Sequence, residues 1–419
     1  MSKPKRVLLI GGNFSPELTG IGKYNGEMID MLAKQGYQCS VITSFPYYPH
    51  WQVQEPYTKN SMWFRKELRV VPGAASDVQS IEVFRCPHYI PAKPTGLKRM
   101  ISDFSFCLSA FIKTFQFLFK PKYDFVIVVA PPFQLGLLGV LYQKIRGARL
   151  LYHIQDLQID AARDFNLIRS AFIINLLLKV EKYILKKANI VSSISQGMIK
   201  KIKLKYPREV IFFPNWVDTS LFFPISESIQ LKTDFGFNSS DKIVLYSGAI
   251  GEKQGLEAIL ECAKELAHNV NLKFVICGSG PYKEKLEEMK QAQQLDNVVF
   301  LPLQPYDKLN CFLNMADIHL VLQKANATDL VMPSKLTAIL SVGGLAIITA
   351  NKNSSLFDVV DAHKMGVLIE PENAGALVAA IDHTLVNNHS NDANRNARLY
   401  AEEYLSIEQI FKKFALHLS

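Results

Sequence analysis

The sequence predicts an α/β protein built from two doubly wound parallel sheets, and three observations predict this class. The chain has 419 residues, more than the about 250–300 at which one hydrophobic core stops growing. Short apolar strands alternate with helical segments in both halves, which is typical of a parallel sheet covered on both faces. A segment with two prolines, residues 213–224, interrupts this alternation between the halves.

The first half begins with a strand. The apolar run at residues 7–10 ends at Gly11 and Gly12, which favours a strand over a signal peptide. The six cysteines are scattered without a C-x-x-C pair, so we expect neither a zinc site nor a disulfide framework. We therefore expect a cytoplasmic protein. Strands are expected at 6–10, 38–43, 124–130, 149–153 and 190–194, and helices at 27–35, 133–145 and 173–188.

The second half repeats the plan. Strands are expected at 243–247, 272–277, 298–301, 318–322 and 346–349, and helices at 256–267, 282–293, 308–315 and 334–342. Ligands of doubly wound sheets bind outside the carboxyl ends of the strands. We therefore expect two facing domains, 1–214 and 215–400, with the active site in the cleft between them. Residues 401–419 are expected to form a helix that returns to the first domain.

Charge is distributed unevenly along the chain. Residues 1–210 contain 30 Lys and Arg and 14 Asp and Glu, a net charge of +16, whereas residues 211–419 have a net charge of −7. This asymmetry indicates that the first domain faces a polyanion or an anionic membrane. A solvated basic helix face is the alternative. The basic residues follow no recognised nucleic-acid-binding module, so nucleic acid is not an expected partner.

Two segments of the first half are both apolar and basic. Residues 101–119 are rich in phenylalanine and follow Lys98 and Arg99. Their length approaches the about 20 residues of a membrane span, but polar residues such as Asp103 argue against spanning. We interpret the segment as a helix in the membrane interface, with basic residues at the head groups. Residues 165–187 have a similar composition, and core helices of the first domain are the alternative for both.

The turn after the expected strand 243–247 is glycine-rich. Gly248, Gly251 and Gly255 allow the backbone to approach a ligand, and the following helix start offers free N–H groups and a positive dipole end. Lys253 could supply a positive charge to a diphosphate. Residues 277–280 form a second turn of the same kind. A purely structural turn is the alternative for each.

A third turn lies at residues 331–336. Pro333 and Ser334 stand at a helix start, where Ser334 could cap the helix or bind phosphate. Lys335 is in the first helical turn, where a cation is normally disfavoured. An anion such as a nucleotide diphosphate would stabilise it there, and a side chain pointing to solvent is the alternative.

Together these segments resemble the GT-B glycosyltransferases, specifically the large retaining group numbered family 4, over essentially the whole chain. Residues 213–224 resemble the interdomain signature of the family, with Trp216 in place of its usual glycine. Residues 247–255 resemble its donor-phosphate loop, with Lys253 as the phosphate-binding lysine, and residues 277–280 resemble its next nucleotide-facing loop. The resemblance implies the GT-B fold, two facing Rossmann-like domains.

The chain is most similar to bacterial enzymes that build surface polysaccharides such as lipopolysaccharide, O-antigen or capsule, and that transfer fucose or N-acetylfucosamine. The similar stretches are residues 14–24, 46–52, 153–156 and 331–336. The resemblance implies that Tyr24, Tyr47, His50, Trp51 and Gln155 bind the acceptor. It implies donor binding by Thr19, Gly20, Gly22, Gly248, Glu252, Lys253, Gly278, Gly280, Leu301, Leu303, Pro333, Ser334, Lys335 and Leu336.

The sequence departs from the family pattern at two positions. Ala249 stands where the family has a phosphate-binding arginine, and Ala338 stands where it has a glutamate that holds the ribose. The partner glutamate of that pair would fall at or beside Leu330, and Asp329 is the nearest acid.

No D-x-D motif occurs in the chain, so we expect neither a metal nor another cofactor. The leaving diphosphate must then be stabilised by protein charges and amides. The expected catalytic residues are Asp156, Lys253, Asp329 and Lys335, with the acceptor hydroxyl attacking on the side of the leaving group. Capping of the turn after its strand is the alternative role for Asp156.

The sequence thus predicts a transferase that moves a hexosyl residue, N-acetylfucosamine or fucose, from a UDP-linked sugar. The expected acceptor is a saccharide linked to polyprenyl diphosphate, and the expected location is the inner face of the cell membrane. A catalytically silent sugar-nucleotide-binding partner of another transferase is the alternative, suggested by Ala249 and Ala338. A sugar-nucleotide epimerase of the same fold is a second, although its soluble substrate would not require the apolar helices.

Overall fold

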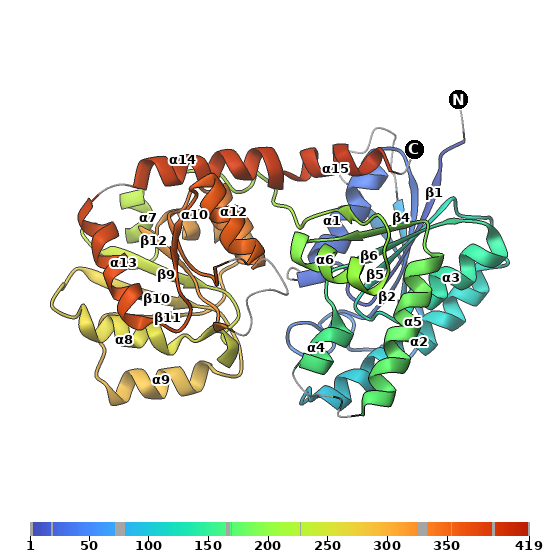
Figure 1. Ribbon diagram of the computed structural model, residues 1–419, viewed down its shortest axis with the longest axis horizontal. Coiled ribbons are helices and arrows are strands. Elements are labelled where there is room, and N and C mark those ends of the chain that lie inside the picture. Colours follow the sequence, from blue (N-terminus) through green and yellow to red (C-terminus); the bar gives the residue numbers. More distant parts are fainter. Residues whose placement is uncertain are drawn as a thin grey trace. The chain divides into compact units, whose positions relative to one another are not determined.

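The computed structural model describes residues 3–17, 20–71, 80–164, 168, 170–226, 228–325, 333–352, 354–387 and 390–417. The chain divides into two compact units, Met1–Phe213 and Pro214–His417 (Figure 1), each built on one sheet. The division falls at the start of the segment in which the prolines interrupt the strand–helix alternation.

The sheet of the first unit has eight strands in the order β3-β4-β2-β1-β5-β6-β7-β8. All neighbours are parallel except β3 and β4. The central strands are apolar and buried on both faces, as in β5, because helices cover a parallel sheet on both sides. The strands are β1 (Arg6–Gly11), β2 (Gln38–Ser44), β3 (Arg65–Val70), β4 (Ser80–Cys86), β5 (Phe125–Ala130), β6 (Arg149–Ile154), β7 (Ile190–Ser193) and β8 (Ile211–Phe212).

Six α-helices connect these strands in the described part of the first unit. They are α1 (Gly20–Lys34), α2 (Gly96–Phe117), α3 (Leu135–Arg146), α4 (Gln158–Asp164), α5 (Ala171–Lys187) and α6 (Gln196–Lys205). Helix α3 packs against both α2 and α5, so these three helices lie side by side along the sheet (Figure 1). Strand order reverses between β1 and β5, which lead in opposite directions through α1 and α3. Such a reversal opens a crevice at the carboxyl ends of the two strands.

The sheet of the second unit has six parallel strands in the order β11-β10-β9-β12-β13-β14. Its strand order reverses between β9 and β12, so the second crevice is expected at the carboxyl ends of these strands. The strands are β9 (Lys242–Ser247), β10 (Leu272–Cys277), β11 (Val298–Leu301), β12 (Ile318–Val321), β13 (Ala346–Thr349) and β14 (Val367–Ile369).

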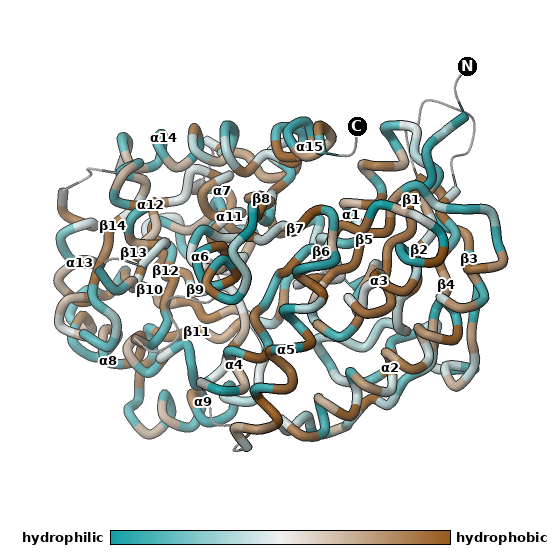
Figure 2. The backbone as a smooth tube through the Cα atoms, turned by 45° about the vertical axis from the view of Figure 1, so that its right-hand side comes forward, coloured by the Kyte–Doolittle hydropathy of each residue, from teal (hydrophilic) through white to brown (hydrophobic). Residues whose placement is uncertain are grey.

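The second unit contains nine helices among its described residues. They are α7 (Ser228–Asp234), α8 (Glu257–Glu265), α9 (Lys283–Ala292), α10 (Leu309–Asn314), α11 (Ser334–Ser341), α12 (Ser355–His363), α13 (Ala374–Asn387), α14 (Ser390–Tyr400) and α15 (Ile407–Ala415). Adjacent residues of one strand enter different core clusters, such as Leu245 in one and Val244 in the other, so both faces of the sheet are covered. The apolar strands are visible as brown stretches of the tube in Figure 2.

The segment that resembles the interdomain signature packs into the second unit. Trp216 is 1 % exposed, and its ring lies 5.0 Å from that of Phe411 in α15. Val217 exchanges backbone hydrogen bonds with Leu405 and Ile407. The tryptophan that replaces the usual glycine therefore fills a core position.

The two predicted doubly wound sheets are confirmed, and several element boundaries differ from the prediction. Helix α1 begins at Gly20, seven residues before the predicted start at residue 27. A Cβ at Gly22 would lie 2.5 Å from Glu17 Oε2, and one at Gly26 would lie 2.9 Å from Ser15 Cβ. These glycines, which are weak helix formers, are placed by tertiary packing that the local sequence does not show.

Candidate functional site

Two glycine turns pack backbone against backbone at the carboxyl end of the second sheet. Gly248 N–H donates to Cys277 O at 2.9 Å, and Ile250 N–H donates to Ser279 O at 2.9 Å. A Cβ at Gly278 would lie 1.8 Å from Gly248 O, and one at Gly280 would lie 2.0 Å from Ile250 O. Only glycine allows this approach, so the two predicted phosphate loops form one continuous wall.

The side chain of Lys335 ends at this wall. Its Nζ lies 3.7 Å from the centroid of the Tyr246 ring and 3.5 Å from the position of a Cβ at Gly248. Tyr246 OH donates to Ala249 O at 2.6 Å, which fixes the ring. Helix α11 therefore delivers a cation to the glycine turn after β9.

The ammonium group of Lys335 is buried and has no hydrogen-bonding partner among the described residues. Burial without a counter-charge lowers its pKa from 10.5 to about 7. The contact with the Tyr246 ring offsets only part of this cost. An anion at the glycine wall would satisfy this group, which is the chemistry that the sequence predicted for Lys335.

The other predicted donor residues surround this lysine less closely. Glu252 and Lys253 are exposed on the short 3-10 turn Glu252–Gln254, and Lys253 O accepts a bond from Lys324 N–H at 3.0 Å. Ser334 is exposed, and the N-cap residue of α11, Pro333, makes no side-chain capping hydrogen bond. The exposed side chains of Lys253 and Ser334 thus remain available to a ligand.

Three leucines have different surroundings. Leu301 is half-buried and Leu303 is exposed at the end of β11, where a ligand could reach the main chain. Leu336 is fully buried, and its N–H donates to Pro333 O at 2.9 Å. Leu336 therefore supports the turn and offers no free donor to a ligand.

Two predicted site residues, Thr19 and Asp329, lie outside the described residues. Their roles stay predictions.

The first unit holds a cavity of about 310 Å³ at the carboxyl ends of β1 and β5, where its strand order reverses. Four predicted residues lie together in its wall, namely Gly20, Tyr47, Trp51 and Asp156. The remaining lining residues are Gly12, Asn13, Ile21, Ser44, Tyr48, His88, Arg99, Ser102, Asp103, Phe106, Pro131, Pro132 and Gln158. Sequence segments far apart thus meet at one crevice.

Aromatic rings form one side of this cavity. The Tyr47 ring lies 5.4 Å from Trp51 and 4.9 Å from His88, both edge to face. The guanidinium of Arg99 lies 5.0 Å from the Trp51 ring. Trp51 has a φ of 53°, a left-handed conformation that costs a non-glycine residue energy and is often found at functional sites.

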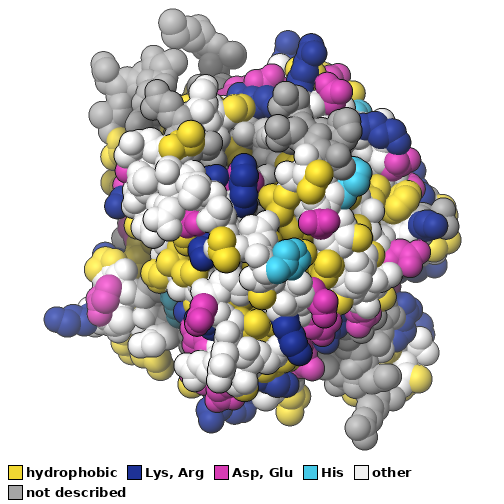
Figure 3. Space-filling view, turned by 90° about the vertical axis from the view of Figure 1, so that its left-hand side faces the viewer, with side chains coloured by type: hydrophobic (Ala, Val, Ile, Leu, Met, Phe, Trp, Pro, Cys, Tyr) yellow, Lys and Arg dark blue, Asp and Glu magenta, His cyan; other side chains and the backbone are white. Residues whose placement is uncertain are grey.

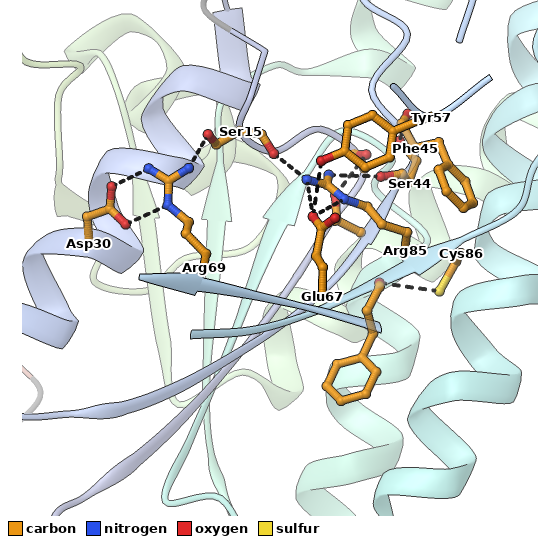
Figure 4. Close-up of polar contacts among 12 residues, drawn as sticks. Ser15, Asp30, Ser44, Phe45, Tyr57, Glu67, Arg69, Arg85 and Cys86 are labelled. Carbon is orange, nitrogen blue, oxygen red and sulfur yellow. Dashed lines mark hydrogen bonds and ion pairs between the residues drawn. The ribbon is translucent and has the colours of Figure 1, made fainter. Parts of the chain in front are cut away.

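The loop after β1 is held in place by two arginines (Figure 4). Arg85 is buried and donates to Ser15 O at 2.5 Å, Ser44 O at 3.2 Å and Glu67 Oε1 at 2.8 Å. Arg69 forms a bidentate pair with Asp30 at 3.0 and 2.6 Å and also bonds to Ser15 Oγ. Ser15, in the loop after β1, is therefore anchored to β3 and β4.

Glu17 links this loop to the aromatic side of the cavity. Its Oε1 accepts bonds from the N–H groups of Tyr47 and Tyr48, both at 2.9 Å. Burial raises the pKa of Glu17 above 4.5, although these bonds oppose the shift. The position of Tyr47 thus depends on a carboxylate outside the cavity lining.

Three predicted acceptor residues do not line the cavity. Tyr24 is 4 % exposed, and its ring lies 5.2 Å from Lys23 Nζ. His50 is exposed on the loop, whereas Gln155 is buried and its N–H donates to Ala130 O at 2.9 Å. The sequence prediction also missed Asp103, His88, Arg99 and Gln158. An acid inside an apolar helical segment was the one available signal, for Asp103.

A larger cavity, about 540 Å³, lies at the amino ends of β9, β12 and β13. This is the edge of the sheet opposite to the glycine turns. Its Arg398 donates to the carbonyl oxygens of Phe222 and Ser341 at 2.8 and 2.6 Å, so its guanidinium already has structural partners. This cavity therefore has little in common with the predicted donor site, which lies at the glycine turns. In the part of the chain that the structure describes, no group of three His, Cys, Asp or Glu side chains could hold a metal ion.

Comparison with known proteins gives matches over both units. Residues 19–216 match the family model described as "Glycosyl transferase 4-like domain", and residues 228–401 match "Glycosyl transferases group 1". The chain is 41% identical over 418 residues to the putative colanic acid biosynthesis glycosyl transferase WcaI of Escherichia coli, covering 98% of each chain.

Solved structures share the fold at low sequence identity. The sucrose-phosphate synthase of Thermosynechococcus elongatus superimposes with a TM-score of 0.76 at 16% identity, covering 99% of this chain and 98% of that one. Anabaena Alr3699/HepE in complex with UDP has a TM-score of 0.69 at 14% identity, with 99% of both chains covered. WaaG, a glycosyltransferase involved in lipopolysaccharide biosynthesis, has a TM-score of 0.67 at 13% identity, covering 98% of this chain and 99% of that one.

Proposed function

Because the chain belongs to the group 1, or family 4, glycosyl transferases of GT-B fold, we propose that it transfers a hexosyl residue from a UDP-linked sugar to a saccharide on polyprenyl diphosphate. The proposal places this step in the synthesis of a bacterial surface polysaccharide. The WcaI relative is named for colanic acid biosynthesis, which supports the pathway class. Fucose or N-acetylfucosamine is the proposed donor sugar, as the sequence resemblance implies.

The buried ammonium of Lys335 is the observation that carries the donor site. It lies against the glycine turn after β9 and has no hydrogen-bonding partner among the described residues. A diphosphate at this turn would be stabilised by the positive charge of Lys335 and by N–H groups at the start of α11. A solved structure of the fold in complex with UDP supports the choice of nucleotide.

In the proposed reaction, an acceptor hydroxyl attacks the anomeric carbon on the face from which the diphosphate leaves. A new carbon–oxygen bond forms as the bond from the anomeric carbon to the phosphate oxygen breaks, and the departing phosphate takes the hydroxyl proton. Charge builds up on the leaving diphosphate, where Lys335 and Lys253 stabilise it. Asp156, in the wall of the first unit's cavity, is proposed to contact the acceptor.

The proposed acceptor is lipid-linked, and the surface of the first unit supports this. Helices α2 and α5 expose large apolar side chains, among them Phe104 at 67 %, Phe119 just beyond α2 at 78 % and Phe172 at 77 %. Lys98 and Lys182 on the same helices are exposed. Apolar side chains flanked by basic residues fit the interface of an anionic bilayer. By contrast, Figure 3 shows basic and acidic side chains intermixed on the face that it views.

No helix in the described part of the chain is long and apolar enough to cross a membrane. We propose peripheral binding at the inner membrane face. Replacing Phe104 and Phe119 by Ser should weaken binding to phosphatidylglycerol vesicles by about a hundredfold or more, since each buried Phe contributes about 1.5–3 kcal/mol. The exposed Val270 of the second unit, replaced by Ser, is the control. Absence of binding of the wild-type protein to these vesicles at low salt would contradict membrane binding.

The alternative is a silent sugar-nucleotide-binding partner, favoured by Ala249 and Ala338. The deciding experiment incubates the protein with UDP-sugars and a polyprenyl-diphosphate saccharide and measures lipid-linked product. Transfer that K335M abolishes, and that the exposed-surface control K264M preserves, supports the enzyme. Binding of UDP without transfer from any donor would support the silent partner.

A further inference from the structure

The cavity of the first unit contains polar groups to which the proposed reaction assigns no task. Asp103, in the second turn of α2, and His88, two residues beyond β4, both line the cavity. Neither was among the residues predicted to bind the acceptor. Both differ from the aromatic residues beside them because they can hydrogen-bond to a ligand.

We propose that this cavity binds a single pyranose ring of the acceptor, with Asp103 accepting a hydrogen bond from one hydroxyl and His88 bonding to another. The inference rests on the proposed function and names the substrate group and the residues that select it. Asp103 and His88 are therefore specificity-determining residues for the acceptor.

The orientation of Asp103 is fixed by Gln158. Phe133 N–H donates to Gln158 Oε1 at 2.9 Å, so the amide nitrogen of Gln158 faces the other way and donates to Asp103 Oδ2 at 3.0 Å. The other carboxylate oxygen, Oδ1, has no hydrogen-bonding partner among the described residues. One oxygen is thus anchored, and its neighbour remains available to a ligand hydroxyl.

His88 supplies a second unsatisfied group from the loop after β4. Both of its ring nitrogens are buried and lack a hydrogen-bonding partner among the described residues. Burial lowers the pKa of His88 to about 4, so the ring is neutral near pH 7, with one nitrogen as donor and one as acceptor. Buried polar groups in folded proteins are nearly always bonded, so an unpaired ring at a cavity wall indicates a missing partner.

The size and lining of the cavity favour one sugar ring. A volume of about 310 Å³ lies at the small end of ligand pockets, which span about 300–1,000 Å³. Tyr47 and Trp51 offer apolar faces for the C–H side of a pyranose, while Asp103 and His88 face its hydroxyl rim. A phosphate fits less well, because two carboxylates, Asp103 and Asp156, line the cavity against the single cation Arg99.

Protonation of Asp103 gives the inference a pH signature. Burial raises the pKa of Asp103 from 3.8 to about 6, opposed by the bond from Gln158 and by Arg99. The other titratable groups in the cavity wall are Tyr47, Tyr48, His88 and Asp156. Below pH 6 the carboxyl becomes neutral and loses strength as an acceptor, so binding of the sugar should weaken as the pH falls through 6.

Fluorine NMR of the full chain labelled with 5-fluorotryptophan can test this inference. The sequence has three tryptophans, which give three signals. Trp51 lines the cavity, whereas Trp63 is exposed elsewhere and Trp216 is buried in the second unit. The probes are the methyl glycosides of fucose, galactose, glucose, mannose and N-acetylglucosamine, and W51F assigns the reporting signal.

At least one glycoside should shift the Trp51 signal and leave the other two unchanged. D103N should weaken that binding by about 10- to 100-fold, the effect of losing a hydrogen bond to a charged group. It should also remove the pH dependence near 6. D124N, at the amino end of β5, is the matched control and should bind as wild type. H88Q should weaken binding independently of any folding defect in D103N.

Two outcomes would overturn the inference, namely no shift with any glycoside, or equal affinity and pH profile in wild type and D103N. UDP binding, measured in parallel, separates this from the proposed function. Glycoside binding without transfer activity would uphold the cavity and count against the transferase. Transfer activity without glycoside binding at Trp51 would support the transferase and contradict the sugar site in the cavity.

Discussion

Binding of UDP should be coupled to uptake of a proton by Lys335. In the free protein the buried ammonium has a pKa of about 7, so at pH 8 about nine-tenths of the molecules carry the neutral amine. A diphosphate at the glycine wall would stabilise the charged form and raise this pKa towards its ordinary value. Binding at pH 8 should therefore take up about 0.9 proton per UDP.

The sign of the pH dependence follows from the same shift. Between pH 7 and the pKa of the bound state, the complex holds a proton that the free protein lacks, so affinity falls as the pH rises. Each pH unit in this window should weaken binding by about tenfold. The terminal phosphate of the nucleotide has a pKa of about 6, so it is ionised at pH 8 and contributes little to the uptake.

Isothermal titration calorimetry measures this uptake directly. The observed enthalpy, plotted against the ionisation enthalpy of the buffer, has a slope equal to the number of protons exchanged. K335M keeps the length of the side chain and removes the titrating group, so its slope should be close to zero. A zero slope for wild type, or an equal slope for K335M, would refute the assignment of Lys335 to the diphosphate.

Three further predictions concern stability and are measured by urea unfolding. K335M without ligand should be more stable at pH 7 by about 1–3 kcal/mol, because a buried unsatisfied group is removed; an unchanged midpoint would mean that the ammonium is solvated. G278A should lower the free energy of unfolding by about 3 kcal/mol or more, since its Cβ would lie 1.8 Å from Gly248 O. The control G375A should be nearly neutral, because the nearest neighbour of its Cβ would lie at 3.7 Å. Equal effects of the two substitutions would contradict the close packing. R85M should cost about 3–5 kcal/mol by leaving Glu67 without its cation, and a cost below 1 kcal/mol would show that the loop after β1 is held by other contacts.

The sequence predicted the features that depend on local patterns. The apolar runs of β1, β5, β9 and β10 predicted buried parallel strands, because their side chains are apolar on both faces of the strand. The glycine turns after β9 and β10 could also be predicted locally, because the glycines that allow close approach of the backbone directly follow their strands.

Features that depend on distant contacts could not be predicted. Strand β3 is charged and largely exposed at the sheet edge, so its residues lack the pattern of a buried strand. The cavity of the first unit joins the loop after β1 to residues on α2, in the loop after β4 and on α4, and the tertiary fold brings them together. The burial that lowers the pKa of Lys335 likewise depends on tertiary packing, which places its Nζ against the ring of Tyr246, far away along the chain.

The most direct test of the account measures transfer of a radiolabelled hexosyl residue from UDP-linked sugars to a polyprenyl-diphosphate saccharide. Wild type should produce a lipid-linked product, and K335M should reduce its rate by about 100-fold or more, as expected for loss of a group that stabilises the charge of the transition state. K264M should leave the rate unchanged. Tight binding of UDP with no transfer from any donor sugar would contradict the proposed function.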